Sequence, residues 1–288
     1  MNTMILAQAI VSGFLTGCVY AITSVGLTLI YSLMRLVNFA HGELLMLSMY
    51  LTYFAWEIFG LDPLFFLPIC AIIMFLFGEF VYKQVISRII DAPKLNQIFT
   101  TFAMVIFFQS LAQFLWGPDY KKVVHPLIDG RIDIAGLFLS LPQFVSGIVA
   151  LVAFFSFYWF FMKTRTGKAM RATAQDAEAA SAMGIDTNKM YMIAVGFGTA
   201  AVGIAGALLT NSYSVHPRAG IPFILIAFVV VALGGFGSVL GSLIGAIIVG
   251  ITEAIFGLYL PPTFKRAIIF SLFILVMYFR PRGLMGKY

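Results

Sequence analysis

Four polar residues lie close together in an otherwise apolar part of the chain: Arg35, Asn38, His41 and Glu43. Polar groups at membrane depth usually face a cavity or a partner, so one hypothesis places these residues along a solute pathway or its gate. Position alone favours a different hypothesis, in which they form an interface site. Arg35 would then anchor the end of an apolar run, while His41 and Glu43 would hydrogen-bond within a turn.

A lone acidic residue, Glu253, lies in the apolar region between Arg218 and Lys265. A carboxylate buried there needs a partner or water, which suggests a place facing a cavity in the same pathway. Because Glu253 lies near the end of its apolar run, an interfacial carboxylate is an equally good interpretation.

The connection from Lys163 to Lys189 is too long for a turn and too regular for a flexible linker. Its composition predicts a surface helix over about 167–184, rich in helix-forming residues and ending at Gly184 as a C-cap. Small side chains would allow a partner surface to approach the helix backbone, while neighbouring polar groups contact that partner. The small residues are Ala172, Ala179, Ala180 and Ala182, and the polar ones are Arg171, Asp176 and Glu178. An ordinary amphipathic interfacial helix is the alternative.

Motifs for catalysis and for nucleotide binding are missing from the sequence. It contains no G-x-x-x-x-G-K-[ST] loop, H-E-x-x-H or G-x-S-x-G motif, so we expect no catalytic residues and no ATP binding through such a loop. Cys18 and Cys70 are isolated, without metal-ligand spacing. We therefore expect neither a metal nor a cofactor on this chain.

The elements that must position these residues are membrane helices. Of 288 residues, 61% are hydrophobic and 10% are charged, which is typical of an all-α polytopic transmembrane bundle. A break near Gly26 is plausible in the first segment, and the seventh is short enough for a half-helix. The bundle should contain about eight or nine spans, from apolar segments at 5–34, 42–58, 62–81, 95–116, 143–162, 190–211, 222–235, 239–257 and 264–279.

Basic residues set the predicted orientation. With the amino terminus outside, 12 of the 18 Lys and Arg residues fall on the side that also holds the carboxyl terminus, which should be cytoplasmic. The net charge of +6 follows from this bias, so we expect a lipid bilayer and no nucleic acid as partner. The outer connection 117–142 should be a solvated loop. Glycines at GxxxG spacing, Gly13 with Gly17 and Gly237 with Gly241 and Gly245, predict tight helix packing.

Residues 178–184 resemble the start of the EAA motif of bacterial ABC importer permeases, because Glu178-Ala179-Ala180 is followed after three residues by Gly184. The later Ile-x-Leu-Pro part of the motif is absent, and this divergence resembles the LivH-type branched-chain amino acid permeases. GLTLIYSLMRLVNFAHGELLMLSMYL at 26–51, VVVALGGFGSVLGSLIGAIIVGITEAIF at 229–256 and the terminal RPRGL are also similar to that branch.

The resemblance implies a single permease domain over 1–288 in the bacterial inner membrane. Its ATPase-coupling residues would be Arg171, Asp176, Glu178, Ala179, Ala180 and Gly184. Its partners would be a second homologous permease, two cytoplasmic ATPases that use ATP and Mg, and an extracytoplasmic substrate-binding protein. Branched-chain amino acids would be the family default as substrate, while other amino acids, amides, urea and small aromatic acids stay open.

Two other functions are open at this point. An ion-coupled secondary transporter or channel for a small polar solute would need carboxylates deep in the spans, and only Glu79 and Glu253 are candidates. A membrane enzyme would need a polar cluster at one face, for which 35–43 is the candidate.

Overall fold

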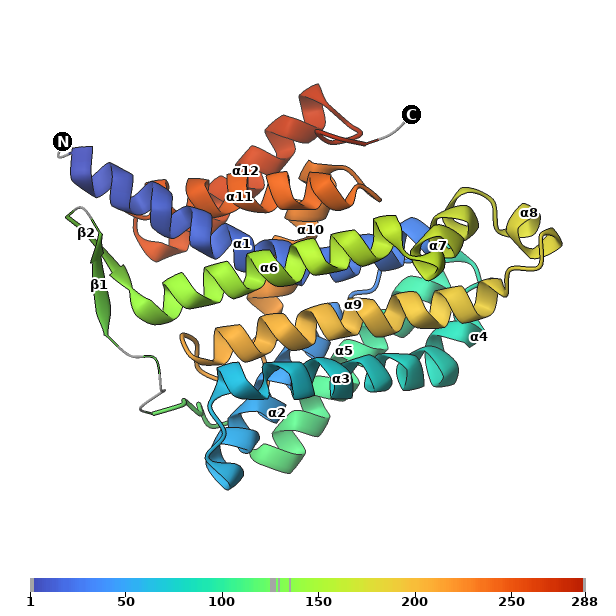
Figure 1. Cartoon of the computed structure of the whole chain (residues 1–288), viewed down its shortest axis with the longest axis horizontal. Helices are drawn as coiled ribbons and strands as arrows, with labels where there is room; N and C mark the ends of the chain where they lie inside the picture. The colour runs from blue at the N-terminus through green and yellow to red at the C-terminus, as the bar shows by residue number, and fades with distance from the viewer. Residues whose placement is uncertain (1–2, 125–127, 129, 135, 287–288) are drawn as a thin grey trace.

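The computed structural model describes residues 3–124, 128, 130–134 and 136–286. Long helices run side by side along the molecule, and a short hairpin lies at one end (Figure 1). In chain order the elements are α1 (Thr3–Met34), α2 (His41–Phe59), α3 (Pro63–Val81), the π-helical turn η1 (Tyr82–Ile86), α4 (Ser87–Ile89), α5 (Lys94–Trp116), β1 (Arg131–Ile134), β2 (Leu137–Ser140), α6 (Leu141–Lys163), α7 (Arg165–Gln175), α8 (Ala177–Ala182), α9 (Thr187–Thr210), α10 (Gly220–Gly234), α11 (Val239–Phe256) and α12 (Pro262–Phe279).

Each predicted apolar segment forms a helix, but the segments differ in their ability to cross a bilayer. α10 has 15 residues, about 22 Å, which is shorter than the apolar core of a membrane. α2 begins with His41-Gly42-Glu43, and α12 carries Lys265 and Arg266 near its start. The structure therefore supports a polytopic helical membrane protein but not the predicted eight or nine spans. Among the described residues, six stretches are long and apolar enough to cross: Met4–Met34, Pro63–Ile89, Lys94–Trp116, Leu141–Lys163, Thr187–Thr210 and Val239–Phe256.

The first helix is unbroken, contrary to the predicted break near Gly26. Gly26 instead lets α1 approach α9, because a methyl group at this position would lie only 2.9 Å from the Cα of Gly198. Gly13 and Gly17 do the same against α11, where a methyl on Gly13 would lie 2.7 Å from the Gly250 carbonyl oxygen. The glycines of α1 therefore serve close backbone packing.

The predicted glycine series at the start of α11 is only partly correct. Gly237 precedes the helix, in a left-handed conformation with φ of +87°, and Ser238 caps the helix by accepting a hydrogen bond from the Gly241 amide. Gly245 does lie on the helix, where a methyl would approach the Val230 carbonyl oxygen of α10 to 2.8 Å.

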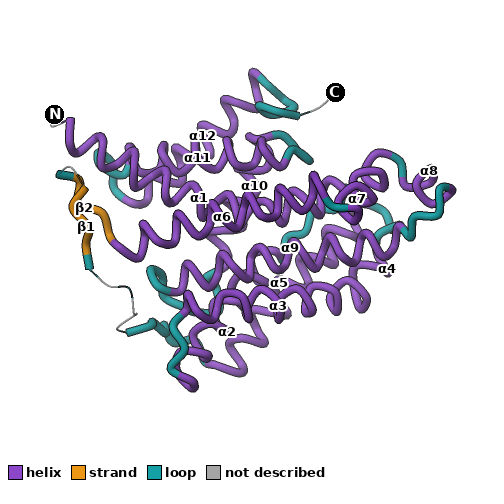
Figure 2. The backbone as a smooth tube through the Cα atoms, in the orientation of Figure 1, coloured by secondary structure: helices purple, strands orange, loops and turns teal. Residues whose placement is uncertain are grey.

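The connections gather at two ends of the bundle. One end holds α7, α8 and the α1–α2 turn, where the Lys94 ammonium donates to the Arg35 carbonyl over 3.0 Å. The opposite end holds the β1–β2 hairpin, drawn in orange in Figure 2, and the beginning of α1, whose Gln8 amide donates to the Phe138 carbonyl. Within the connection 117–142, β1 and β2 pair as an antiparallel hairpin, and Lys121 forms a β-bridge with Val215.

We predict that Gly26→Ala destabilises the bundle. The added methyl has no room beside Gly198, so α1 and α9 must separate, at a cost of about 1–3 kcal/mol. The measurement is the thermal midpoint of the purified protein in detergent. Gly60→Asn is the control, since nothing lies within 4 Å of that position and asparagine tolerates its φ of +64°. Equal midpoints for Gly26→Ala and the unmodified chain would contradict the packing role.

Candidate functional site

The predicted surface helix consists of two helices that meet at Asp176. α7 ends at Gln175 and α8 begins at Ala177, because Asp176 adopts an extended conformation and caps α8 by accepting a hydrogen bond from the Ala179 amide over 3.0 Å. At the other end, Gly184 takes a left-handed φ of +83° with open space around it, which agrees with the predicted C-terminal glycine.

The six residues predicted for coupling occupy different environments. The Arg171 guanidinium donates to the Phe161 carbonyl and lies 5.7 Å from the centre of the Phe161 ring, so it fixes α7 onto α6 instead of facing outward. Ala180 is buried beneath α8. Asp176, Glu178, Ala179 and Gly184 are exposed.

The outer surface of α8 has an apolar tip that was not predicted. Met183 is 84% exposed and follows directly on the exposed Ala182. α8 itself lies at the far end of the bundle, beyond the ends of α6 and α9 (Figure 1). A flexible thioether flanked by small residues can fit a complementary groove on a partner protein. The segment from Asp176 to Gly184 thus presents a surface suited to a partner.

The second group of candidates lies inside the bundle. Asn38, His41 and Glu43 are at most 1% exposed, whereas Arg35 is exposed and separate from them. The His41 ring hydrogen-bonds through Nε2 to the Thr23 carbonyl over 3.0 Å, and the Gln109 amide donates to Glu43 over 2.9 Å. The side chains of His41 and Glu43 therefore bond to other helices, while their backbone amides bond within the turn, to the Asn38 and Ala40 carbonyls.

This buried cluster has unused hydrogen-bonding atoms. Among the described residues, the Asn38 Nδ2, His41 Nδ1 and Glu43 Oε2 atoms are buried without a protein partner. Such atoms are rare in folded proteins and need an explanation in water, a ligand or a second conformation. The cluster can therefore exchange hydrogen bonds with a polar solute or with water.

Two helix N-termini meet beside the cluster. Gly42 lies in the first turn of α2 and Gly220 opens α10, and a methyl on Gly42 would lie 2.8 Å from the Gly220 carbonyl oxygen. Thr23, which receives the His41 hydrogen bond, lies about 16 Å from the end of α1. α2 thus begins well inside the bundle. Helices that begin at this depth mark solute sites in many membrane transporters.

Glu253 lies apart from that cluster, near the hairpin end. Its carboxylate accepts a hydrogen bond from the Tyr20 hydroxyl over 2.8 Å, which connects α11 to α1. Tyr20 is thus the hydrogen-bond partner that the sequence analysis required for a buried Glu253 carboxylate. A pathway role for Glu253 stays a prediction.

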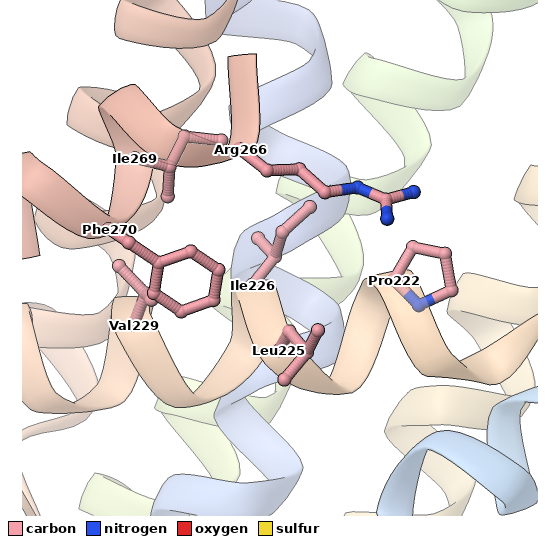
Figure 3. Close-up of a pocket in the computed structure, with 7 residues that line it drawn as sticks. All are labelled: Pro222, Leu225, Ile226, Val229, Arg266, Ile269 and Phe270. Carbon is pink, nitrogen blue, oxygen red and sulfur yellow. The ribbon is translucent and has the colours of Figure 1, made fainter. Parts of the chain in front are cut away.

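A small pocket between α10 and α12 is a weaker candidate (Figure 3). The side chain of Arg266 extends toward Pro222, and Phe270 faces Val229 across the pocket. Its volume of about 20 Å³ has room for little more than one water molecule, and its walls are almost entirely apolar. It cannot hold a solute.

Three residues that take part in these sites were not singled out from the sequence: Gln109, Tyr20 and Met183. Gln109 is an amide within an apolar run, which is a signal that could have been used. Tyr20 and Met183 look like ordinary apolar residues in sequence. Among the described residues, no group of three or more His, Cys, Asp or Glu side chains could hold a metal ion.

The fold defines a multi-pass helical membrane protein, with polar groups buried among its helices and a surface segment at one end. Residues 9–277 match the family model described as the permease component of the branched-chain amino acid transport system. The chain therefore belongs to this family of transport permeases.

Curated relatives match along nearly the whole chain. The high-affinity branched-chain amino acid transport system permease protein BraD of Pseudomonas aeruginosa is 30% identical, over 97% of this chain and 95% of BraD. The permease protein LivH of Escherichia coli is also 30% identical, with the same coverage. A probable LivH of Methanocaldococcus jannaschii is 27% identical over 91% of this chain and 83% of that protein. No solved structure matches the chain.

We predict that Gln109→Leu destabilises the protein by about 1–3 kcal/mol, because the Glu43 carboxylate then loses the amide donor that binds it inside the bundle. The thermal midpoint in detergent measures the effect. Gln113→Leu, one turn further along α5 at an exposed position, is the matched control and should leave the midpoint nearly unchanged. An equal response of the two variants would show that the hydrogen bond from Gln109 to Glu43 contributes nothing.

Proposed function

We propose that the chain is the permease subunit of an ATP-driven importer of branched-chain amino acids, and that Asp176–Gly184 is its ATPase-coupling segment. The protruding, exposed α8 carries the proposal, since it presents Glu178, Ala179 and Met183 at one end of the bundle. The substrates named for BraD and LivH support the choice of branched-chain amino acids.

In this proposal all of 1–288 forms one permease domain in the inner membrane. It works with a second homologous permease, two cytoplasmic ATPases and an extracytoplasmic binding protein. ATP and Mg act in the ATPases, and this chain has no enzymatic step. Closure of the ATPases would move α8, and α7 would pass that movement to α6 through Arg171 and the Phe161 carbonyl.

The proposed topology has nine passes with the amino terminus outside. α2 and α10 begin inside the bundle, so in this proposal the connections that precede them complete their two passes. The position of α8 beside the Lys- and Arg-rich connections supports a cytoplasmic α8 end. The carboxyl terminus would then also be cytoplasmic.

The buried cluster of Asn38, His41 and Glu43 would gate the pathway. Its unpartnered atoms support this role, because they can form hydrogen bonds in one state of the transport cycle that are absent in the other. Arg35, at the surface, would anchor the α1–α2 turn at the membrane boundary.

We predict that Glu178→Lys and Gly184→Trp each lower substrate-dependent ATP hydrolysis by the purified complex at least about tenfold, as expected for changes at the centre of a partner interface. Both residues are exposed, but the φ of +83° at Gly184 strains a tryptophan, so the thermal midpoint of each variant must first show that the permease still folds. ATP hydrolysis and uptake are measured together in proteoliposomes.

Lys122→Glu is the control for these variants, as a charge reversal at an exposed position in the outer connection. It should leave ATP hydrolysis unchanged. Normal coupling in both α8 variants would refute the assignment of α8 as the coupling segment.

A further inference from the structure

A cavity of about 400 Å³ opens between α1, α6 and α9. It lies where α6 begins and α9 ends, at the hairpin end of the bundle and away from α8 (Figure 1). Its volume falls within the range of small-molecule binding sites. The cavity is separate from the buried Asn38–Glu43 cluster, which does not line it.

One wall of the cavity is aliphatic. Leu15, Val19, Leu208 and Leu209 line it, from α1 and α9, and each is at most 6% exposed. These side chains match a branched hydrocarbon group and cannot satisfy a polar one.

A second wall is the first turn of α6, which offers hydrogen-bond donors. Ser140 does not cap the helix, the Leu141 amide bonds to the Gly130 carbonyl, and Pro142 has no amide hydrogen. The amide of Gln143, a residue that lines the cavity, is therefore the donor that helix geometry leaves over at this positive helix end.

Ser146 provides an independent sign of a ligand in the same wall. It lines the cavity, is 5% exposed, and its hydroxyl has no protein partner. A buried hydroxyl without a partner costs free energy unless something in the cavity bonds to it. A carboxylate placed there could accept hydrogen bonds from Ser146 and from the start of α6.

The cavity also has a site for a cation. Tyr20 lines it and donates its hydroxyl hydrogen to Glu253, so the hydroxyl oxygen stays free to accept a hydrogen bond. Glu253 does not line the cavity, but its negative charge lies directly behind that hydroxyl. An ammonium group next to Tyr20 would therefore be stabilised by Glu253 acting through Tyr20.

We propose that this cavity binds an aliphatic α-amino acid, with its carboxylate at Ser146 and the start of α6, its ammonium at Tyr20, and its side chain against the leucines of α1 and α9. The proposal rests on the importer function above and adds a binding site within the permease chain itself. Glu253 is a positioning residue in this site. None of the described Lys or Arg side chains lines the cavity, which argues against a multiply charged anion.

The test measures binding of three probes to the full chain in lipid nanodiscs: L-leucine, 4-methylpentanoate, which lacks the ammonium, and 3-methylbutylamine, which lacks the carboxylate. Ser146→Ala should weaken the binding of leucine and of 4-methylpentanoate roughly tenfold or more, and leave the binding of 3-methylbutylamine unchanged. Glu253→Gln should weaken the binding of leucine and of 3-methylbutylamine by a similar factor, and leave the binding of 4-methylpentanoate unchanged.

Ser156→Ala is the matched control, a serine on the same helix at an exposed position. It should bind all three probes as the unmodified chain does. A variant that loses one ligand contact should bind only some of the probes more weakly. A misfolded variant would instead bind all three probes more weakly, so the two effects can be told apart. Absence of leucine binding at millimolar concentration, or equal effects of the two variants on all probes, would overturn the proposal.

Failure of this site is distinguishable from failure of the importer function. The binding test needs no ATPase, whereas the importer function is tested by ATP-dependent uptake. Uptake that persists while the probe pattern is absent would refute the cavity site alone. The predicted probe pattern without ATP-driven uptake would refute the importer and leave the binding site in place.

Discussion

Close backbone contact along α1 is the constraint on which the rest of the structure depends. In lipid no hydrophobic force drives helices together, so association depends on packing and hydrogen bonds. α1 meets α11 through Gly13 and Gly17 and meets α9 through Gly26, with no side chain between the backbones at these points. These contacts set the positions of α9 and α11, and through them of the elements that pack on those two helices.

The position of α2 follows from this arrangement. Since α1 continues unbroken past Gly26, the chain turns back after Met34, and His41 reaches the Thr23 carbonyl in the interior of the bundle. α2 and α10 then begin next to each other, where only Gly42 and Gly220 leave room for both backbones. The buried polar cluster is thus a consequence of two helices that begin inside the bundle.

The sequence predicted the location of the helices well, because apolar runs and their polar ends mark each element. It could not predict which helices span the bilayer. The 15 apolar residues of α10, for example, predict a helix whether or not that helix crosses the membrane. The break at Gly26 was a wrong prediction, because a glycine in a long apolar run fits both a kink and a close helix contact. Only the partner, Gly198, distinguishes the two, and it lies far away in sequence.

The candidate sites were predictable only in part for the same reason. Asn38, His41, Glu43 and Glu253 stand out as polar residues in apolar surroundings, but Gln109 and Tyr20, which bind them, come from other helices. Likewise, the helix-forming composition of 163–189 indicated a surface helix. It did not indicate that Arg171 would donate a hydrogen bond to the Phe161 carbonyl of α6, or that α8 would be the exposed part of the segment.

In the proposed importer, α6 and α9 connect the ATPase-coupling segment at one end of the bundle to the binding cavity at the other. α6 lines the cavity with Ser146 near its start, and Phe161 near its other end holds Arg171 of α7. α9 starts just after the α8 turn and ends at the aliphatic wall with Leu208. These helices have 23 and 24 residues, about 35 Å, and little internal freedom. A displacement of α8 therefore reaches the cavity along two stiff helices. The fixed contact of α9 with α1 at Gly26 lies between the two ends and can serve as the pivot.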